Sequence, residues 1–443
     1  MVIVFLLAAV TALVGLHWYV WRRLVRDTTA GPGRARRIGT AVFVALPVLM
    51  VAAFVAERGG APFWLQRTLA WPGFLWLALF IYLGLGLIAG EAVRPLLSRF
   101  LERRRPAETP AAPVPLRKAE TVPAGAAEAV EPATAAPDTP DVPQSPDSSN
   151  SPNSPSAPGT PDSPRLLAAP SRRLFVSRVV AGAAAAAAVG TVGYGTYGVV
   201  RGPRVKRVTV PLAKLPRGAH GFRIAVVSDI HLGPVLGRGF AQKVVDTINS
   251  TQPDLIAVVG DLVDGSVKDL GPAAAPLAQL RARHGAFFVT GNHEYFSGAE
   301  EWVEEVRRLG LRPLENARVE LPAFDLAGVN DIAGESEGQG PDFAKALGDR
   351  DTSRASVLLA HQPVQIHDAV EHGVDLQLSG HTHGGQLWPG TFIADLANPT
   401  LAGLEQYGDT QLYVTRGAGA WGPPTRVGAP SDITVVELAS AQA

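Results

Sequence analysis

Four stretches of this 443-residue chain contain no Asp, Glu, Lys or Arg and are each about as long as a lipid bilayer is thick. They are residues 2–20, 38–56, 69–89 and 179–200. Because about 20 apolar residues in a helix cross the hydrocarbon core, each stretch is predicted to be a transmembrane helix. A buried helix of a soluble protein is the alternative. Aromatic residues near the ends of the stretches favour the membrane, namely Trp18, Tyr19, Trp21 and Trp71.

Arginine residues indicate how these helices are oriented. Six arginines lie between the first and second stretches and five follow the third, whereas the connection between the second and third holds only Arg58 and Arg67. Basic loops stay in the cytoplasm, so the N-terminus is predicted outside and Arg94 onward inside. No recognisable cleavage site follows the first stretch, and residues 1–105 are therefore predicted to form a three-helix transmembrane region with basic cytoplasmic loops.

A segment of different composition follows, at residues 106–170. It holds 16 of the 37 prolines, many Ala and Ser, and no aromatic residue. Such a segment cannot bury enough apolar surface to offset its chain entropy. It is predicted to be a disordered linker.

Arg172 and Arg173 precede the fourth stretch, which is rich in Ala and Gly and only weakly hydrophobic. This arrangement is similar to bacterial twin-arginine export signals. Residues 171–203 are therefore predicted to be an anchor helix that carries the rest of the chain outside, whether it is retained or cleaved. Basic residues directly after the stretch count against this orientation: Arg201, Arg204, Lys206 and Arg207.

Residues 204–443 alternate strand-like and helical patterns, which predicts an α/β domain. Five strand-like runs in it end in residues that ligate metals, within the motifs D-x-H, G-D-x-x-D, G-N-H-E, a lone His and G-H-x-H. Ligands of α/β sheets gather beyond the carboxyl ends of strands, so these motifs are expected to converge. Their chemistry-bearing residues are Asp229, His231, Asp261, Asp264, Asn292, His293, Glu294, His361, His381 and His383.

The spacing and type of these residues predict a metal centre. Residues two apart, such as Asp229 and His231, point to the same side of an extended backbone. Glycine directly before Asp261, Asn292 and His381 allows sharp turns and close approach to an ion. The chain has no cysteine, so any metal must be bound by oxygen and imidazole, a mixture that suits Mn, Fe or Zn. Seven such ligands are too many for one ion and predict two, about 3.5–4 Å apart.

The five motifs, in this order, resemble the calcineurin-like metallophosphoesterase superfamily. The segments "GHTHGGQLWPG" and "YVTRGAGAWGPPTRVGAP" are similar to its bacterial membrane-associated branch, which is often exported by the twin-arginine route. That branch is related to UDP-2,3-diacylglucosamine pyrophosphohydrolases. The resemblance covers residues 204–438 and implies an αββα sandwich of two sheets flanked by helices.

The resemblance also implies a role for each motif residue. The ligands of the first metal would be Asp229, His231, Asp261 and His383. The ligands of the second would be Asp261, Asn292, His361 and His381, with Asp261 shared. His293 would protonate the leaving oxygen or stabilise the transition state. Asp264 and Glu294 are expected to support the site by hydrogen bonds, and the loop residues Gly384, Gly385 and Gln386 to shape it. Ser431 and Asp432 stand where the branch usually has Pro-Glu, which puts one substrate contact in doubt.

The predicted reaction is hydrolysis of a phosphodiester or pyrophosphate bond by in-line attack of hydroxide generated at two divalent cations. A lipid or cell-envelope substrate is favoured, with UDP-diacylglucosamine-type hydrolysis included. A membrane-anchored nucleotidase or general phosphodiesterase acting on soluble substrates is the first alternative, and an inactive metal-binding sensor or scaffold is the second. The formal net charge of zero predicts no nucleic-acid partner, and the oligomeric state stays open.

Two further features have open interpretations. Apolar residues just after the metal histidines would either form a rim for a lipid chain or pack in the core: Leu387, Trp388, Phe392 and Ile393. Asp331 would either contact substrate or form a turn. The protein as a whole is predicted to be a multi-pass protein of the cell membrane with an extracytoplasmic catalytic domain.

Overall fold

The computed structural model describes residues 2–103 and 171–442. The predicted linker, residues 106–170, lies outside the described residues. The chain divides into two compact units, one of Met1–Ser98 with Ser171–Ala443 and one of Arg99–Pro170. The structure describes the first unit almost completely and only the end of one helix from the second.

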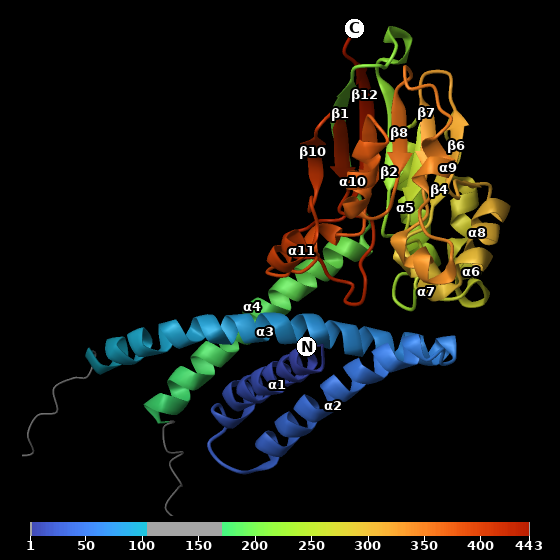
Figure 1. The fold of residues 1–443 in the computed structure, drawn as a ribbon. Coiled ribbons are helices and arrows are strands. Elements are labelled where there is room, and N and C mark those ends of the chain that lie inside the picture. The colour runs from blue at the N-terminus through green and yellow to red at the C-terminus, as the bar shows by residue number, and fades with distance from the viewer. Residues whose placement is uncertain (1, 104–170, 443) are drawn as a thin grey trace, which may run out of the picture. The chain divides into compact units, whose positions relative to one another are not determined.

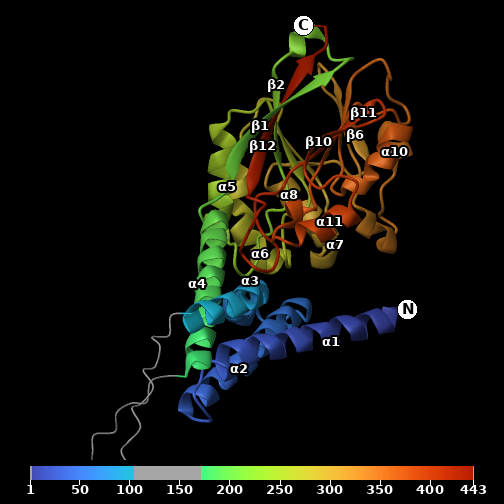
Figure 2. The same ribbon diagram turned by 90° about the vertical axis from the view of Figure 1, so that its left-hand side faces the viewer.

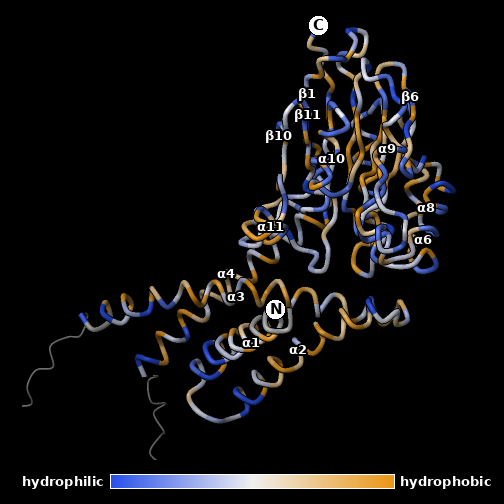
Figure 3. The backbone as a smooth tube through the Cα atoms, viewed as in Figure 1, coloured by the Kyte–Doolittle hydropathy of each residue, from blue (hydrophilic) through white to orange (hydrophobic). Residues whose placement is uncertain are grey.

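Four long helices contain the four predicted membrane stretches (Figure 1). They are α1 (Val2–Trp21), which a π-helical turn at Arg22–Arg26 extends, α2 (Arg34–Arg58), α3 (Phe63–Arg103) and α4 (Arg172–Val200). Within the described ranges, three segments are long and apolar enough to cross a membrane: Arg34–Arg58, Phe63–Phe100 and Arg172–Val200. These match the second, third and fourth predicted stretches, and Figure 3 shows hydrophobic residues along them.

Two six-stranded mixed sheets form the remainder of the first unit. In spatial order, the first sheet contains β1 (Arg204–Leu212), β12 (Asp432–Ser440), β2 (Phe222–Val227), β3 (Leu255–Val259), β4 (Ala286–Val289) and β5 (Arg312–Pro313). The second contains β10 (Gly403–Tyr407), β11 (Thr410–Val414), β9 (Leu376–Ser379), β8 (Ser356–Leu359), β7 (Asp325–Gly328) and β6 (Ala317–Glu320).

The sheets pack face to face, with helices on both outer faces (Figures 1 and 2). Ile224 and Phe287 from the first sheet share a buried core with Leu326 and Tyr413 from the second. The outer helices are α5 (Arg238–Ser250), α6 (Val267–Ala274) and α8 (Ala299–Arg308) on the first sheet, and α9 (Phe343–Leu347) and α10 (Ile366–Glu371) on the second. The predicted αββα sandwich is therefore confirmed.

Short helices occupy several connections. Two are α-helical, α7 (Asn292–Ser297) and α11 (Thr391–Ala397). The others are 3-10 turns at Arg217–Ala219, Ala275–Gln279, Ile332–Glu337, Pro363–Gln365 and His383–Gly385.

The five ligand-bearing runs are strands β2, β3, β4, β8 and β9. Strands β2, β3 and β4 are mutually parallel, as are β8 and β9. Every residue of Leu255–Val259 is buried, which is typical of a parallel strand covered on both faces. Since the carboxyl ends of parallel strands lie at one edge, the loops that carry the predicted ligands meet there.

Candidate metal centre

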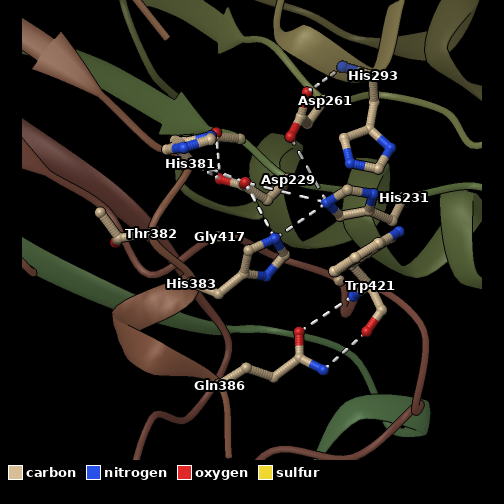
Figure 4. Close-up of polar contacts among 12 residues, drawn as sticks. Asp229, His231, Asp261, His293, His381, Thr382, His383, Gln386, Gly417 and Trp421 are labelled. Carbon is tan, nitrogen blue, oxygen red and sulfur yellow. Dashed lines mark hydrogen bonds and ion pairs between the residues drawn. The ribbon is translucent and has the colours of Figure 1, made fainter. Parts of the chain in front are cut away.

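Asp229, His231 and His383 form the first cluster of ligand-type side chains (Figure 4). Nε2 of His383 lies 3.3 Å from Oδ1 of Asp229 and 3.0 Å from Nε2 of His231. Nε2 of His231 lies 3.8 Å from Oδ2 of Asp261. This cluster, with Asp261, contains the residues predicted for the first metal.

Asp261, His361 and His381 form the second cluster. Nε2 of His361 lies 3.1 Å from Oδ2 of Asp261, and Nδ1 of His381 lies 3.0 Å from Oδ1 of Asn292. In both clusters the ligand atoms lie within 4.8 Å of one another. The structure thus brings all seven predicted ligands together, with Asp261 between the two groups.

The chemistry of these donors fits divalent cations. Carboxylate oxygens, an amide oxygen and imidazole nitrogens are ligands of borderline metals. Asp229, His231, Asp261 and His361 are almost completely buried, and burying such polar groups is costly unless they are paired or bind an ion. Nδ1 of His361 lies 2.8 Å from the carbonyl of Val259, to which it donates, so Nε2 is directed into the site.

Burial and neighbouring charges set the titration of the cluster. Burial would raise the pKa of Asp261, but the charge and hydrogen bond of His361 outweigh it and hold this pKa well below its usual range. Burial, together with the charge of His361, lowers the pKa of His381 to about 4. Burial and the charge of His231 also hold the pKa of His383 well below its usual range. His381 and His383 are therefore neutral near pH 7, the form in which imidazole binds a metal.

The backbone at the predicted ligands is unusual. Non-glycine residues rarely adopt positive φ, and such conformations cost about 1–3 kcal/mol each where the surrounding structure maintains them. Eight described non-glycine residues have positive φ, and five of them are predicted ligands with φ between 48° and 72°. These five are Asp229, His231, Asp261, His381 and His383.

This finding corrects one sequence-based expectation. Asp229 and His231 were expected to face the same side because they are two apart in an extended backbone. Strand β2 ends at Val227, and φ is 51° at Asp229 and 48° at His231. The two side chains enter the same site because a left-handed turn directs them there.

Asp264 connects a predicted ligand to the predicted proton donor. Its Oδ1 lies 2.8 Å from Nδ1 of His231 and 2.7 Å from Nδ1 of His293. Burial would raise the pKa of Asp264, yet the two histidines lower it to about 2. Burial would lower the pKa of His293, but the hydrogen bond and charge of Asp264 raise it to about 9. His293 is therefore protonated near neutral pH.

Glu294 is fully buried and holds two ligand loops together. Its carboxylate accepts hydrogen bonds from the backbone amides of Asp261 at 3.0 Å, Leu262 at 2.8 Å and Gly291 at 2.6 Å. Burial and the nearby charge of Asp261 raise the pKa of Glu294 to about 7. Asp261 precedes Leu262 in one loop and Gly291 precedes Asn292 in the other, so this side chain fixes their spacing.

Gln386, three residues after His383, holds Trp421 beside His293. Nε2 of Gln386 donates to the carbonyls of Trp421 at 2.9 Å and Pro423 at 3.1 Å, and its Oε1 accepts from the amide of Trp421 (Figure 4). The Trp421 ring lies 5.6 Å from the His293 ring. Gly384 and Gly385 have φ of 60° and 77°, which favours glycine.

Sequence reasoning missed Arg426, whose side chain is almost completely buried beneath His383. Its guanidinium donates to the His383 carbonyl at 2.9 Å, and its Nη2 lies 3.0 Å from Nδ1 of that ring. Burial lowers the pKa of Arg426 to about 10. The arginine lies within the quoted "TRVGAP" segment, but nothing local in the sequence shows that it is buried under a ligand.

Ser228 and Phe296 were also missed. The Ser228 hydroxyl donates to Asp229, and the Phe296 ring lies 5.5 Å from the His293 ring. Ser228 directly precedes Asp229, so its place next to the D-x-H motif could have identified it from the sequence. The position of Phe296 depends on helix α7.

The structure also places Asp331, Asp432 and the apolar residues after the metal-site histidines. Asp331 is buried and accepts hydrogen bonds from the amide of Ala333 and the side chain of Gln362, as a turn residue does. Asp432, at the Pro-Glu departure, is buried and accepts a hydrogen bond from the Thr415 hydroxyl at 2.6 Å. Among the apolar residues after the histidines, Phe392 and Ile393 do not pack in the core, since they are 64% and 74% exposed.

Known proteins that are similar in sequence match the part of the chain that contains this site. The sequence profile of the calcineurin-like phosphoesterase family matches residues 222–385, which include every predicted metal ligand. The chain is 40% identical over 262 residues to a Danio rerio protein named transmembrane protein with metallophosphoesterase domain, covering 56% of this chain and 60% of that protein. The matches with this relative and with two Helicobacter pylori metallophosphoesterases span less than two thirds of their length.

Two shorter relatives match over nearly their whole length. A metallophosphoesterase of Aquifex aeolicus (strain VF5) is 36% identical over 240 residues, covering 53% of this chain and 91% of the relative. A metallophosphoesterase of Bacillus subtilis (strain 168) is 30% identical over 285 residues, covering 61% of this chain and 98% of the relative. By its profile match and these relatives, the chain belongs to the calcineurin-like metallophosphoesterase family.

Proposed function

We propose that this protein is a metal-dependent phosphoesterase that hydrolyses a phosphodiester or pyrophosphate bond. The observation that carries the proposal is the convergence of seven ligand-type side chains beside His293. Asp229, His231, Asp261 and His383 would bind one cation, and Asp261, Asn292, His361 and His381 a second. Such ions, when bound, polarise a phosphoryl group and lower the pKa of a bound water.

The protein's own groups would orient and protonate the substrate. Nδ1 of His293 is engaged with Asp264, so Nε2 is the nitrogen that would donate a proton to the leaving oxygen. The rings of Phe296 and Trp421 lie beside the His293 ring. Asp264 maintains both the orientation and the positive charge of His293.

The favoured substrate is a lipid or cell-envelope phosphodiester or pyrophosphate, including the UDP-diacylglucosamine type. The candidate membrane spans in the same chain and the resemblance of the "GHTHGGQLWPG" segment support this class. A nucleotidase or general phosphodiesterase on soluble substrates is the alternative. Purified full-length protein with Mn²⁺ should be assayed on bis-p-nitrophenyl phosphate, nucleotides and lipid pyrophosphates. Preference for nucleotides over lipid pyrophosphates would contradict the lipid assignment.

We also propose that the catalytic domain is extracytoplasmic and that Arg172–Val200 acts as an internal twin-arginine export anchor. The arginine distribution sets the orientation, and contacts between the helix ends group these ends as the topology requires. On the predicted cytoplasmic side, Arg23 pairs with Glu91 at 2.9 Å, and Arg178 donates to the Thr28 carbonyl at 3.0 Å.

The predicted outer ends contact the catalytic domain instead. The Arg58 guanidinium lies 5.4 Å from the centre of the Phe296 ring, and Lys243 donates to the Val200 carbonyl at 2.7 Å. A topology reporter fused after Arg207 should be active outside the cytoplasm. A reporter active only in the cytoplasm would contradict this orientation.

A scaffold without activity is the remaining alternative. His293→Ala should lower kcat by about 10²–10⁴-fold while the metal content is unchanged, because His293 is not a predicted ligand. If the metal-loaded wild type hydrolyses none of the substrates, and His293→Ala has the same metal content and the same lack of activity, the scaffold hypothesis is correct.

A further inference from the structure

We propose that helix α11, with Trp388, inserts into the lipid bilayer and brings the metal centre to the membrane surface, where acyl chains of a lipid substrate lie against this helix. The proposal rests on the phosphoesterase function above and specifies how its lipid substrate is presented.

The first observation is an exposed apolar face outside the four long helices. In α11, Phe392, Ile393 and Leu396 are 64%, 74% and 89% exposed. At about 3.6 residues per turn, their positions i, i+1 and i+4 fall within an arc of about 100° on one side of the helix. Asp395 is the one charged residue between Leu387 and Pro399. A contiguous exposed apolar surface of this kind marks an interaction site.

The second observation shows what lies beside this face. The Tyr82 hydroxyl, within the candidate span Phe63–Phe100, donates to the Trp388 carbonyl at 2.8 Å. Leu387 packs against the cluster formed by the long helices, which includes Ala184, Ala188 and Val192 of α4.

Tyr82 lies inside the predicted stretch 69–89, away from its ends. The chain that leads into α11 therefore adjoins a candidate membrane helix. Lipid around that helix would also reach the exposed face of α11, and this favours bilayer over a second protein as the occupant.

The third observation connects α11 to the metal centre. Helix α11 begins at Thr391, eight positions after His383. A methyl group added at Gly385 would lie 2.3 Å from the Cα of Thr391, so the helix packs directly on the loop of the metal histidines. The loop of the metal histidines would thus hold the phosphate head group of a lipid substrate, and the adjoining helix α11 would hold the acyl chains of the same lipid.

The depth of α11 in the bilayer can be measured without an activity assay, and this measurement tests the proposal. The chain has no cysteine, so Ile393→Cys provides a single labelling site in the full-length protein. The variant is labelled with the fluorophore NBD and reconstituted in phosphatidylcholine nanodiscs, with or without brominated acyl chains. Val370→Cys on α10 is the matched control, because Val370 is 38% exposed and α10 packs in a core cluster that, among the described residues, includes none from α1 to α4.

The expected result is blue-shifted emission at position 393 and quenching by brominated lipid several-fold stronger than at position 370. Equal quenching at both positions, with both labels open to aqueous iodide, would overturn the proposal. Blue-shifted emission without quenching by brominated lipid would show that protein covers α11, which also overturns it.

A second variant tests the substrate. Phe392→Ser, Ile393→Ser and Leu396→Ser are combined, with Val364→Ser and Val370→Ser combined as the control. The triple variant should lose about tenfold or more in kcat/KM on a lipid pyrophosphate in vesicles, since each lost apolar contact weakens binding. Its activity on bis-p-nitrophenyl phosphate should stay within about twofold of wild type.

An equal loss on both substrates would overturn the role in lipid binding. If the wild type hydrolyses neither substrate, the phosphoesterase proposal fails, while the quenching result still decides whether α11 is in the membrane.

Discussion

At the scale of single residues, two carboxylates that are not predicted ligands hold the predicted ligands and His293 in place. Asp264 links His231 to His293 through one oxygen atom, and Glu294 links two ligand loops through backbone amides. Each of these carboxylates has a separate, measurable role.

Asp264→Asn should shift the pH dependence of activity. In the folded protein the pKa of His293 is raised to about 9, so its protonated form is present below that pH and is lost above it. Without the carboxylate this pKa falls, and the alkaline limb of the kcat profile should move to lower pH. The pH profile and metal content are measured together, with Asp269→Asn as the control. An unchanged alkaline limb at full metal content would contradict the role of Asp264.

Glu294→Gln should destabilise the fold by about 1–3 kcal/mol, because an amide NH₂ would face backbone N–H groups that now donate to a carboxylate. The measurement is chemical denaturation in matched buffers. Glu304→Gln is the control, since its side chain is 68% exposed. A change equal to that of the control would show that the carboxylate does not hold the loops.

At the scale of elements, close approach of two strand ends positions the ligands. Helix α7 begins at Asn292, and Gly291 before it leaves no room for a side chain, since an added Cβ would lie 2.3 Å from Oδ1 of Asp261. The need for glycine there arises from contact with another loop, because φ at Gly291 is −106°, which any residue adopts.

Gly291→Ala should therefore lower activity at limiting Mn²⁺ by about tenfold or more, because a shift of a ligand weakens metal binding. Gly237→Ala is a closely matched control. Gly237 also precedes a helix, its φ is −105°, and no atom lies within 4 Å of an added Cβ. Metal titration of both variants decides the point, and equal apparent affinities would contradict the packing argument.

At the scale of the whole molecule, the candidate metal centre takes its residues from both sheets. His231 follows β2 of the first sheet, and His383 follows β9 of the second. A cation held between them would bind the folded state and not the unfolded chain. Binding of this kind stabilises a protein by about 2.7 kcal/mol at a ligand concentration 100 times Kd.

Removal of metal by a chelator should therefore lower the melting temperature of the catalytic domain as well as abolish activity. Addition of Mn²⁺ should restore both, and differential scanning calorimetry of the full-length protein in detergent provides the measurement. His383→Ala should show a smaller metal-dependent shift. A melting temperature that does not respond to metal would count against ions between the sheets.

Much of the fold and site was predictable from sequence because the signals are local. Apolar stretches of membrane length, uninterrupted strands such as Leu255–Val259 and the order of the ligand motifs are properties of short segments. The role of Arg426 was not predictable, because its burial under His383 results from the packing of two loops. The extended conformation expected at Asp229 was wrong because tertiary contacts stabilise a left-handed turn there.

The sequence by itself determined which segments can enter a membrane, which residues can bind a cation and at which strand ends they lie. Hydropathy and ligand chemistry belong to the side chains themselves, so no fold is needed to recognise them. Only the tertiary structure decided that His231 and His383, 152 residues apart, face one another at 3.0 Å and that the apolar face of α11 stays outside the core. Such contacts depend on how two sheets pack across a shared core, and this geometry is not encoded in any one segment.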